Sequence, residues 1–319
     1  MSLRTIETSW VLDSDSIEQD TEELPPAAVL EPRRSLFAQL REIAVDELWV
    51  YRELVYQLTL RDVRIRYKQA VMGFAWAILM PALIIGAGTL VRYAMAYLSG
   101  TEIQLSAIAG MAVKALPWAF FVGAIGFATG SLVSNRPLLT KIYFPREVLP
   151  VSSTLAQTFD SSIGTLVLLL VLPLLGVTYG WTVLWVPYLM IVLFTFTLGT
   201  AMLLGCANLF FRDVKYVVQV LLTFGIFFTP VFFEPSMFGP TGSAVMMLNP
   251  LSPILEGLRL TVVEHHDLFR VLTVTGAGGD PVVVWRPWYL GYGTGIAVVM
   301  LLSGALIFHR FERVFAEYA

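Results

Sequence analysis

The sequence predicts an all-α polytopic membrane protein with six transmembrane helices, an N-terminal amphipathic interface helix and short re-entrant outer helices between spans five and six. Of the 319 residues, 56% are hydrophobic and 14% are charged, a balance too apolar for an ordinary soluble domain. Long runs contain no Asp, Glu, Lys or Arg, and about 20 helical residues cross the hydrocarbon. Basic residues are concentrated in the loops of one predicted side.

Residues 1–45 are expected to form an acidic, flexible cytoplasmic tail. Up to residue 32, a series of carboxylates is accompanied by the single basic residue Arg4, and Pro25, Pro26 and Pro32 follow near its end. Such a segment cannot bury enough apolar surface to offset the entropy cost of ordering. Residues 46–319 are therefore predicted to form the transmembrane domain.

An amphipathic helix over residues 47–68 is expected to lie in the membrane interface. Its apolar residues recur at three- and four-residue spacing, which places Leu48, Tyr51, Val55 and Leu58 on one face. Basic residues crowd its polar face and its end, and beside a first span they favour retention in the cytoplasm. These residues are Arg52, Arg61, Arg64, Arg66 and Lys68.

The apolar runs define the spans. The third takes in Asp160, and the third and fourth are separated by a break at Tyr179, Gly180 and Trp181. The six predicted spans lie near residues 71–93, 110–134, 151–175, 182–209, 215–234 and 288–309.

Loop charges predict the orientation. One side would carry only Arg259, Arg270 and Arg286, all in one loop, whereas the other carries most of the remaining basic residues. Because Lys and Arg are retained inside, a multi-pass protein of the cytoplasmic (inner) membrane with both termini in the cytoplasm is expected. The inside set is Arg52, Arg61, Arg64, Arg66, Lys68, Arg136, Lys141, Arg146, Arg212, Lys215, Arg310 and Arg313.

The long loop between spans five and six is partly apolar. Ile254, Leu255, Leu258 and Thr261 could share one helical face. We expect a short helix or helical hairpin that dips back at the outer surface. A Gly-rich tip around residues 276–279 should then form an exposed turn.

Few residues offer chemistry of their own. The chain has no Gly-Lys dipeptide and hence no phosphate-binding loop, so a partner must hydrolyse any ATP. The net charge of -3 gives no sign of a nucleic-acid partner. The cluster at residues 264–267 (EHHD) is interpreted as a solvated loop, since adjacent residues rarely converge on one metal ion. We predict no catalytic, cofactor or metal site in this chain.

Asp160 is the carboxylate that lies well inside a predicted span, where burial is costly unless it pairs or meets water. Two interpretations remain open. Asp160 either faces a transport path or accepts a hydrogen bond from a Ser or Thr on a neighbouring helix.

Three segments together resemble the membrane subunit of the type-2 ABC exporters of O-antigen, capsular and teichoic acid polysaccharides. The first is residues 61–69 (RDVRIRYKQ), which lead into Gly73, Trp76 and Pro81. The second is residues 135–147 (NRPLLTKIYFPRE) between spans two and three. The third combines residues 210–213 (FFRD) with residues 249–253 (NPLSP) and 256–259 (EGLR). Their order and spacing cover residues 48–315.

The resemblance implies a homodimer joined on its cytoplasmic face by two ATP-binding cassette subunits, which would hold ATP and Mg. It implies lipid-linked polysaccharide as cargo and membrane lipid as surroundings. An outer gate is implied at Asn249, Pro250, Pro253, Glu256 and Arg259. The acidic tail and the extension over residues 265–287 depart from the family pattern. The ATPase-coupling residues would be Arg136, Lys141, Tyr143, Phe144, Pro145, Arg146 and Glu147.

Aromatic side chains are abundant in the spans, and aromatic faces pack on the C–H faces of sugar rings without fixed hydrogen bonds. A polymer could therefore slide past them. The predicted path residues are Trp76, Tyr93, Tyr97, Phe159, Asp160, Phe224, Phe227 and Phe228.

Two other functions remain open. An ABC exporter of a small drug or lipid would share the spans. A polyprenol-dependent membrane glycosyltransferase should show paired carboxylates in an outer loop, but Glu102 stands alone, and Glu256, Glu264 and Asp267 fall in the predicted gate region.

Overall fold

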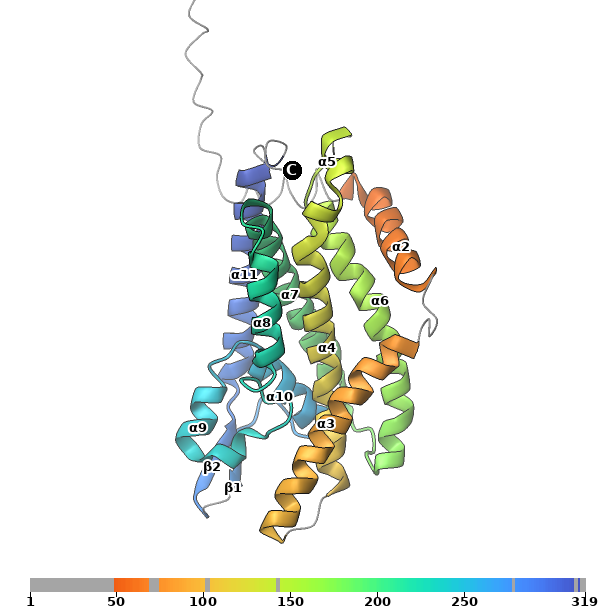
Figure 1. Ribbon diagram of the computed structural model, residues 1–319. Coiled ribbons are helices and arrows are strands. Elements are labelled where there is room, and N and C mark those ends of the chain that lie inside the picture. The colour runs from red at the N-terminus through yellow and green to blue at the C-terminus, as the bar shows by residue number, and fades with distance from the viewer. Residues whose placement is uncertain are drawn as a thin grey trace, which may run out of the picture. The chain divides into compact units, whose positions relative to one another are not determined.

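The computed structural model describes residues 49–68, 75–100, 104–141, 144–276, 279–312 and 315. The predicted acidic tail, residues 1–45, lies outside the described residues, as do the first residues of the predicted interface helix. By their contacts, all the described residues belong to one unit, Leu40–Ala319. This unit is a bundle of helices with a two-stranded hairpin at one end (Figure 1).

Within the described residues, five helices are long and apolar enough to cross a membrane. They correspond to predicted spans one, two, three, four and six, so the chain is a mostly helical polytopic membrane protein. The break predicted between spans three and four is present as two short turns, η3 (Leu172–Leu175) and η4 (Trp181–Leu184). The five helices are α3 (Ala75–Ser99), α4 (Leu105–Ser134), α6 (Val148–Val171), α7 (Trp185–Phe210) and α11 (Trp288–Glu312).

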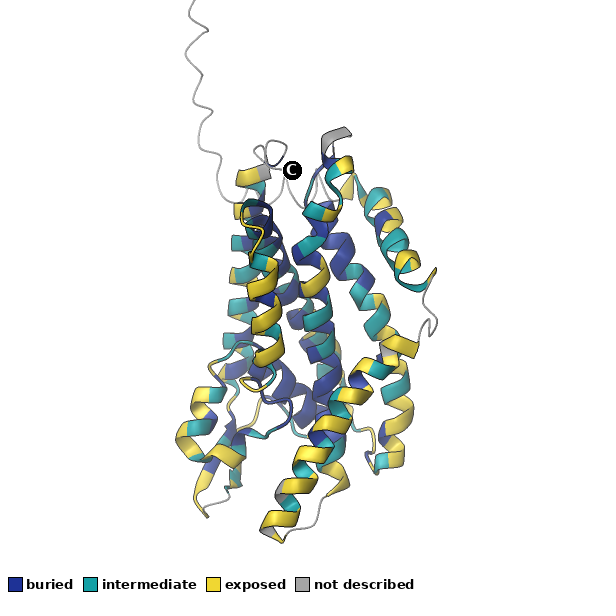
Figure 2. Ribbon diagram, viewed as in Figure 1, coloured by how far each residue is buried: buried dark blue, intermediate teal, exposed yellow. Residues whose placement is uncertain are grey.

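Helix α4 is the centre of the bundle. It contacts α3, α6, α7, α8 and α10, and most of its side chains between Ala109 and Leu132 are buried (Figure 2). Helix α3 is the opposite case, because it leaves large apolar side chains such as Leu83 and Leu90 exposed. Apolar surface of that extent must be covered by lipid or by another chain.

The prediction of one continuous helix over residues 215–234 is wrong in its second half. Helix α8 (Val214–Gly225) has 12 residues, which rise only about 18 Å against a hydrocarbon core of about 30 Å. Residues 226–233 are turns and bends. Pro230 lacks a backbone N–H and disfavours helical geometry in the residue before it, which apolarity alone does not reveal.

Helix α2 (Arg52–Lys68) is the predicted interface helix. It packs against α6 (Figure 1). Leu58 is buried in a hydrophobic cluster, and Tyr51 and Val55 pack against the same cluster. These contacts confirm the predicted apolar face, except at Leu48, which lies outside the described residues. The short helix α5 (Arg136–Lys141) follows α4 at the same end of the bundle.

The predicted re-entrant helix is α10 (Leu251–Val262), and all of its side chains are buried. It packs between α4 and α7. Two shorter helical elements, η5 (Pro235–Phe238) and α9 (Gly239–Met246), precede it. We call this part the hairpin end of the bundle and the opposite part, where α5 lies, the α5 end (Figure 1).

An antiparallel hairpin of β1 (Leu272–Thr275) and β2 (Pro281–Trp285) occupies the region where only an exposed turn was predicted. Its strands are rich in Val and Thr, which favour pleated structure. Gly279 adopts a positive φ of 84° at the turn, a conformation that glycine adopts readily. Trp285 is fully buried and donates a hydrogen bond from Nε1 to the Leu268 carbonyl at 2.9 Å. The hairpin is therefore anchored to the bundle.

Helices α7 and α11 approach each other most closely at two glycines. A Cβ atom added at Gly199 would lie 2.4 Å from the Met300 carbonyl carbon, and one at Gly304 would lie 2.5 Å from the Gly199 oxygen. Backbone atoms cannot move aside as a flexible side chain can. Small residues of this kind let membrane helices pack backbone against backbone.

We therefore expect Gly199→Ala to destabilise the protein by about 1–3 kcal/mol, because overpacking forces the two backbones apart. The measurement is the thermal unfolding midpoint of the detergent-purified protein. Gly295→Ala on α11 is the matched control, since a Cβ there meets nothing within 4 Å. Equal midpoints for the two variants would show that the close approach contributes nothing to stability.

Candidate functional site

A cavity of about 1280 Å³ opens between α2, α3, α4, α6 and α8. Both aromatic and polar side chains line it. Trp76, Trp118 and Phe127 provide ring surface, while Asp160 and Gln157 provide polar groups. A space of this size lies above the usual range for a small-molecule pocket, about 300–1,000 Å³.

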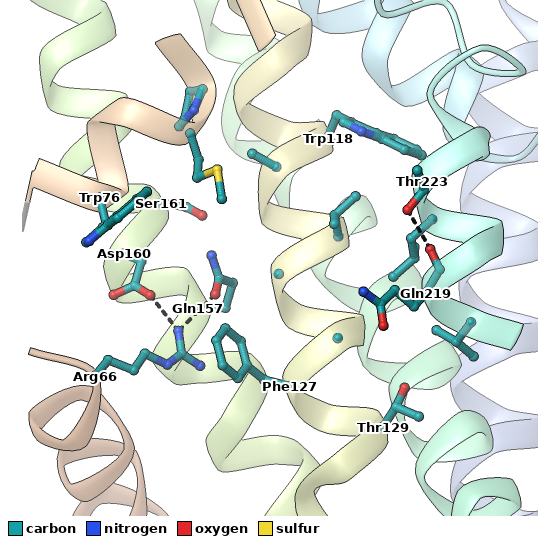
Figure 3. A pocket seen from close by; sticks show the side chains of 18 of the residues that line it. Arg66, Trp76, Trp118, Phe127, Thr129, Gln157, Asp160, Ser161, Gln219 and Thr223 are labelled. Atoms are coloured by element: carbon teal, nitrogen blue, oxygen red, sulfur yellow. Dashed lines mark hydrogen bonds and ion pairs between the residues drawn. The ribbon is translucent and has the colours of Figure 1, made fainter. Parts of the chain in front are cut away.

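The polar wall of the cavity is built where the last turn of α2 meets the middle of α6. The Arg66 guanidinium lies 2.5 Å from an Asp160 oxygen and donates a hydrogen bond of 2.9 Å to the Gln157 side chain. The Tyr67 hydroxyl donates to the other Asp160 oxygen at 2.5 Å. Figure 3 shows Arg66 reaching between Asp160 and Phe127, and its guanidinium carbon is 3.7 Å from the centre of the Phe127 ring.

These contacts bear on the two interpretations of Asp160, although the role of the cavity as a transport path stays a prediction. The carboxylate lines the cavity, as the first interpretation required. Its described partners are Arg66 and Tyr67 on the interface helix and not a Ser or Thr on a neighbouring span. Burial and the hydrogen bond to Asp160 raise the pKa of the Tyr67 hydroxyl above its ordinary value. Tyr67 therefore stays protonated and remains a donor to the carboxylate.

A second wall is formed by α8, which contributes Tyr216, Gln219 and Thr223 (Figure 3). On α4, Gly123 faces the Gln157 side chain, and a Cβ atom there would lie 2.6 Å from the amide carbon. The absence of a side chain at Gly123 leaves room for the flexible Gln157 amide next to α4. The cavity thus combines flat rings with side chains that both donate and accept hydrogen bonds.

The structure separates the predicted path residues into two groups. Trp76 and Asp160 line the cavity. The other six do not line it, and all are exposed on the surface of the bundle. These are Tyr93, Tyr97, Phe159, Phe224, Phe227 and Phe228. Span aromatics can face lipid, a second chain or a path, and their spacing in the sequence does not distinguish these environments.

The interface residues also separate by partner. Arg61 donates to the Asn135 side chain at 2.9 Å and pairs with Asp62, so α2 contacts the residue directly before α5. Arg66 reaches the cavity as described above. The remaining predicted residues of this helix, Arg52, Arg64 and Lys68, are exposed.

The predicted coupling residues gather at the α5 end. Phe144 and Glu147 are buried. A Glu147 oxygen lies 3.6 Å from His309 Nδ1, and the Arg146 guanidinium lies 5.8 Å from the Phe315 ring centre. This loop therefore contacts the last turns of the chain. Arg136 begins α5 and Pro145 is buried. Tyr143 and the side chain of Lys141 lie outside the described residues.

The predicted gate residues lie in α10 or directly before it. Asn249 accepts a hydrogen bond from the Leu251 N–H at its start and donates one to the Phe228 carbonyl at 3.1 Å. Pro250 is its N-cap residue and Pro253 lies in its first turn. Arg259 pairs with Glu256 at 2.6 Å within the buried helix.

Sequence analysis missed Lys114. This side chain is fully buried on α4, lies 3.7 Å from Glu256 and donates a hydrogen bond to the Phe233 carbonyl at 3.1 Å. Nearby, Arg92 pairs with Glu234 at 2.8 Å. The signal was present in the sequence, because a lysine inside an apolar span is expensive and marks a paired or functional position.

Comparison with known proteins places these features in a family. Residues 53–263 match the ABC-2 type transporter family model, a range that runs from the start of α2 to just beyond α10. The chain belongs to the ABC-2 type transporter family. It is a type-2 ABC permease subunit, and the matched range contains the cavity, the α5 region and the buried charges on α10.

Individual relatives align over 70% to 86% of the chain. The O-antigen export system permease protein of Myxococcus xanthus is 31% identical over 283 residues, which are 86% of this chain and 98% of that protein. Two proteins of the same name from Klebsiella pneumoniae are similar at 24% and 25% identity, over 83% and 70% of this chain and 94% and 86% of their own lengths.

We expect Arg66→Met and Asp160→Asn each to destabilise this permease subunit by about 1–3 kcal/mol, because each leaves a partly buried charge without its partner. Thermal unfolding midpoints of both single variants and the double variant give the coupling energy of the pair. Arg64→Met, the same change at an exposed position of α2, should have little effect. Additive losses in the double variant would mean that the two side chains do not stabilise each other.

Proposed function

We propose that this chain is the channel-forming transmembrane subunit of an ATP-driven exporter that moves lipid-linked polysaccharide of the O-antigen type across the cytoplasmic membrane. The observation that carries the proposal is the alignment with an O-antigen export permease over 98% of that protein's length. This alignment of 283 residues extends beyond residues 53–263, the range of the family match, so it supports more than membership of the family.

The cavity chemistry supports a sugar polymer as cargo. Sugar rings present apolar C–H faces and a rim of hydroxyl groups. Trp76 and Phe127, whose rings are exposed, can pack on the faces. The amides and the carboxylate of the other walls can exchange hydrogen bonds with successive hydroxyls. A surface with several weak contacts favours movement over tight retention.

Six crossings with both termini in the cytoplasm follow if the chain between α7 and η5 makes the fifth. Helix α8 starts at the α5 end, and η5 lies at the hairpin end (Figure 1). The chain between α7 and η5 therefore traverses the bundle, although only the 12 residues of α8 are helical. Positive charges on α2, α5 and the end of α11 favour a cytoplasmic position for the α5 end.

A homodimer with two ATP-binding cassette subunits completes the proposal. The exposed apolar surface of α3 and α8 is suited to a second copy of this chain. ATP and Mg would be held by the cassette subunits, which would dock on α5 and residues 144–147. Movement imposed there reaches the cavity through α2, because Arg61 contacts Asn135 next to α5 and Arg66 contacts Asp160 in the cavity wall.

The test is to purify the chain gently from its native membrane, identify the proteins that accompany it, and reconstitute the complex in liposomes. We expect a stoichiometric ATPase subunit and ATP-dependent movement of lipid-linked polysaccharide, detected by an antibody or lectin on the far side. Capsular or teichoic acid polymers in place of O-antigen would change the substrate class.

Two outcomes would contradict the proposal. Movement of a labelled drug or lipid without any polymer would indicate a small-molecule exporter. A chain that purifies alone and transfers sugar from a polyprenol donor would be a glycosyltransferase.

Charge reversal at the proposed contact with the cassette subunit should uncouple ATP hydrolysis from polymer export. Arg146→Glu is expected to lower polymer export by about tenfold or more, the effect of losing about 1.4 kcal/mol of coupling, while the complex still hydrolyses ATP. Both rates are measured on the same proteoliposomes. Arg270→Glu, an equal reversal on an exposed residue two positions before β1, is the control. Unchanged export by the Arg146 variant would remove this loop from the coupling contact.

A further inference from the structure

Six charged side chains meet at the hairpin-end half of the bundle, and we call them the charged cluster. Glu256 is its centre, because one of its oxygens binds Arg259 at 2.6 Å and the other lies 3.7 Å from Lys114. Both Lys114 and Glu256 have no solvent exposure. The full set is Arg92, Lys114, Glu234, Glu256, Arg259 and Glu264.

The charged cluster lies directly beyond the cavity. On α4, Lys114 is two residues before Leu116, which lines the cavity, and lies toward the hairpin end. On α3, Arg92 comes two helical turns after the lining residue Ile84 in the same direction. After α8, whose Thr223 lines the cavity, the chain reaches Phe233 and Glu234. Three independent segments thus place the charged cluster at the same end of the cavity.

The charged cluster also joins the segments of the chain that meet at this end of the bundle. Lys114 connects α4 to α10 through Glu256 and to the turn after α8 through the Phe233 carbonyl. Arg92 pairs with Glu234 and contacts the Phe232 carbonyl at 3.4 Å. Lys114 of α4 therefore binds both α10 and the turn after α8, and Arg92 of α3 binds the same turn.

Ion pairs have a property here that apolar packing lacks. Replacing a buried pair by apolar residues often costs nothing or even stabilises a protein, so stability alone gives little reason for these charges. Their attraction is strong in a dry, low-dielectric interior and weak once water surrounds them. An ion pair of this kind is stable while its surroundings exclude water and becomes weak when water or hydroxyl groups reach it.

We propose that the charged cluster is the dry closure of the cavity, with Lys114 as the positioning residue that holds α10 across the exit until the hydrated polymer solvates the ion pairs. The inference deepens the proposed export function and rests on it for the identity of the polymer. It assigns to Lys114 a role in closing the path. It also gives a reason why Glu256 and Arg259 on α10 are buried.

The test measures leakage through the resting transporter. The complete complex with its ATPase subunits is reconstituted in liposomes loaded with glucose, and glucose efflux is followed without ATP. Lys114→Met, which keeps the length of the side chain but not its charge, is expected to raise efflux about tenfold or more, since loss of about 1.4 kcal/mol from the closed state changes its population tenfold. ATP hydrolysis by the same complex should stay within about twofold if the variant is assembled.

Two further variants separate closure from general damage. Lys114→Arg restores the charge and should return efflux to the wild-type level. Asp280→Asn removes an exposed carboxylate at the turn of the β-hairpin, outside the charged cluster, so efflux should hardly change. Glu256→Gln breaks the same contact from the α10 side. We expect it to raise glucose efflux as Lys114→Met does, so it provides the test if Lys114→Met fails to assemble.

The outcomes are distinct from those for the proposed function. Unchanged glucose efflux with Glu256→Gln, or with an assembled Lys114→Met complex, would refute the proposal that the charged cluster closes the cavity. This holds whatever the wild-type complex exports. Leakage by these variants, reversed by Lys114→Arg, would support it. A wild-type complex that moves no polysaccharide, combined with that pattern of leakage, would refute the substrate class and leave the closure in place.

Discussion

The burial of α10 inside the bundle is the constraint on which the rest of the structure depends. A helix whose 12 side chains are all buried occupies space that a full transmembrane span would otherwise fill. Helix α8 accordingly ends after 12 residues, and the chain continues as turns. Polar backbone groups in those turns need partners in an apolar interior. Side chains of Asn249, Lys114 and Arg92 reach the carbonyls of Phe228, Phe233 and Phe232.

The same arrangement determines where charge can be buried. Glu256 and Arg259 stand three residues apart on α10 and pair within the helix. Lys114 approaches the pair from α4, and the charged cluster as a whole contains three basic and three acidic side chains. The cavity lies on the other side of this layer, between α4, α6 and α8. Aromatic and polar lining residues therefore occupy the part of the bundle from which α10 is absent.

A second polar contact, Arg66 with Asp160, joins the interface helix to the cavity wall. It gives α2 two attachments, one beside α5 through Asn135 and one inside the bundle. A stiff helix fixed at two points carries displacement from one to the other. This geometry connects the surface that we propose binds the ATPase subunit with the cavity that we propose holds cargo.

The sequence by itself determined the positions of five membrane-crossing helices, the interface helix and the short outer helix, because each depends on local apolarity and its period. The family was also visible in the order of short motifs. Tertiary structure alone decided where α8 ends, how residues 272–285 pair, and which aromatic side chains line the cavity. Those features depend on contacts between distant residues, as with Lys114 and Glu256 or Arg66 and Asp160. Whether a charge in an apolar run is paired, and with which residue, is settled only when the helices pack.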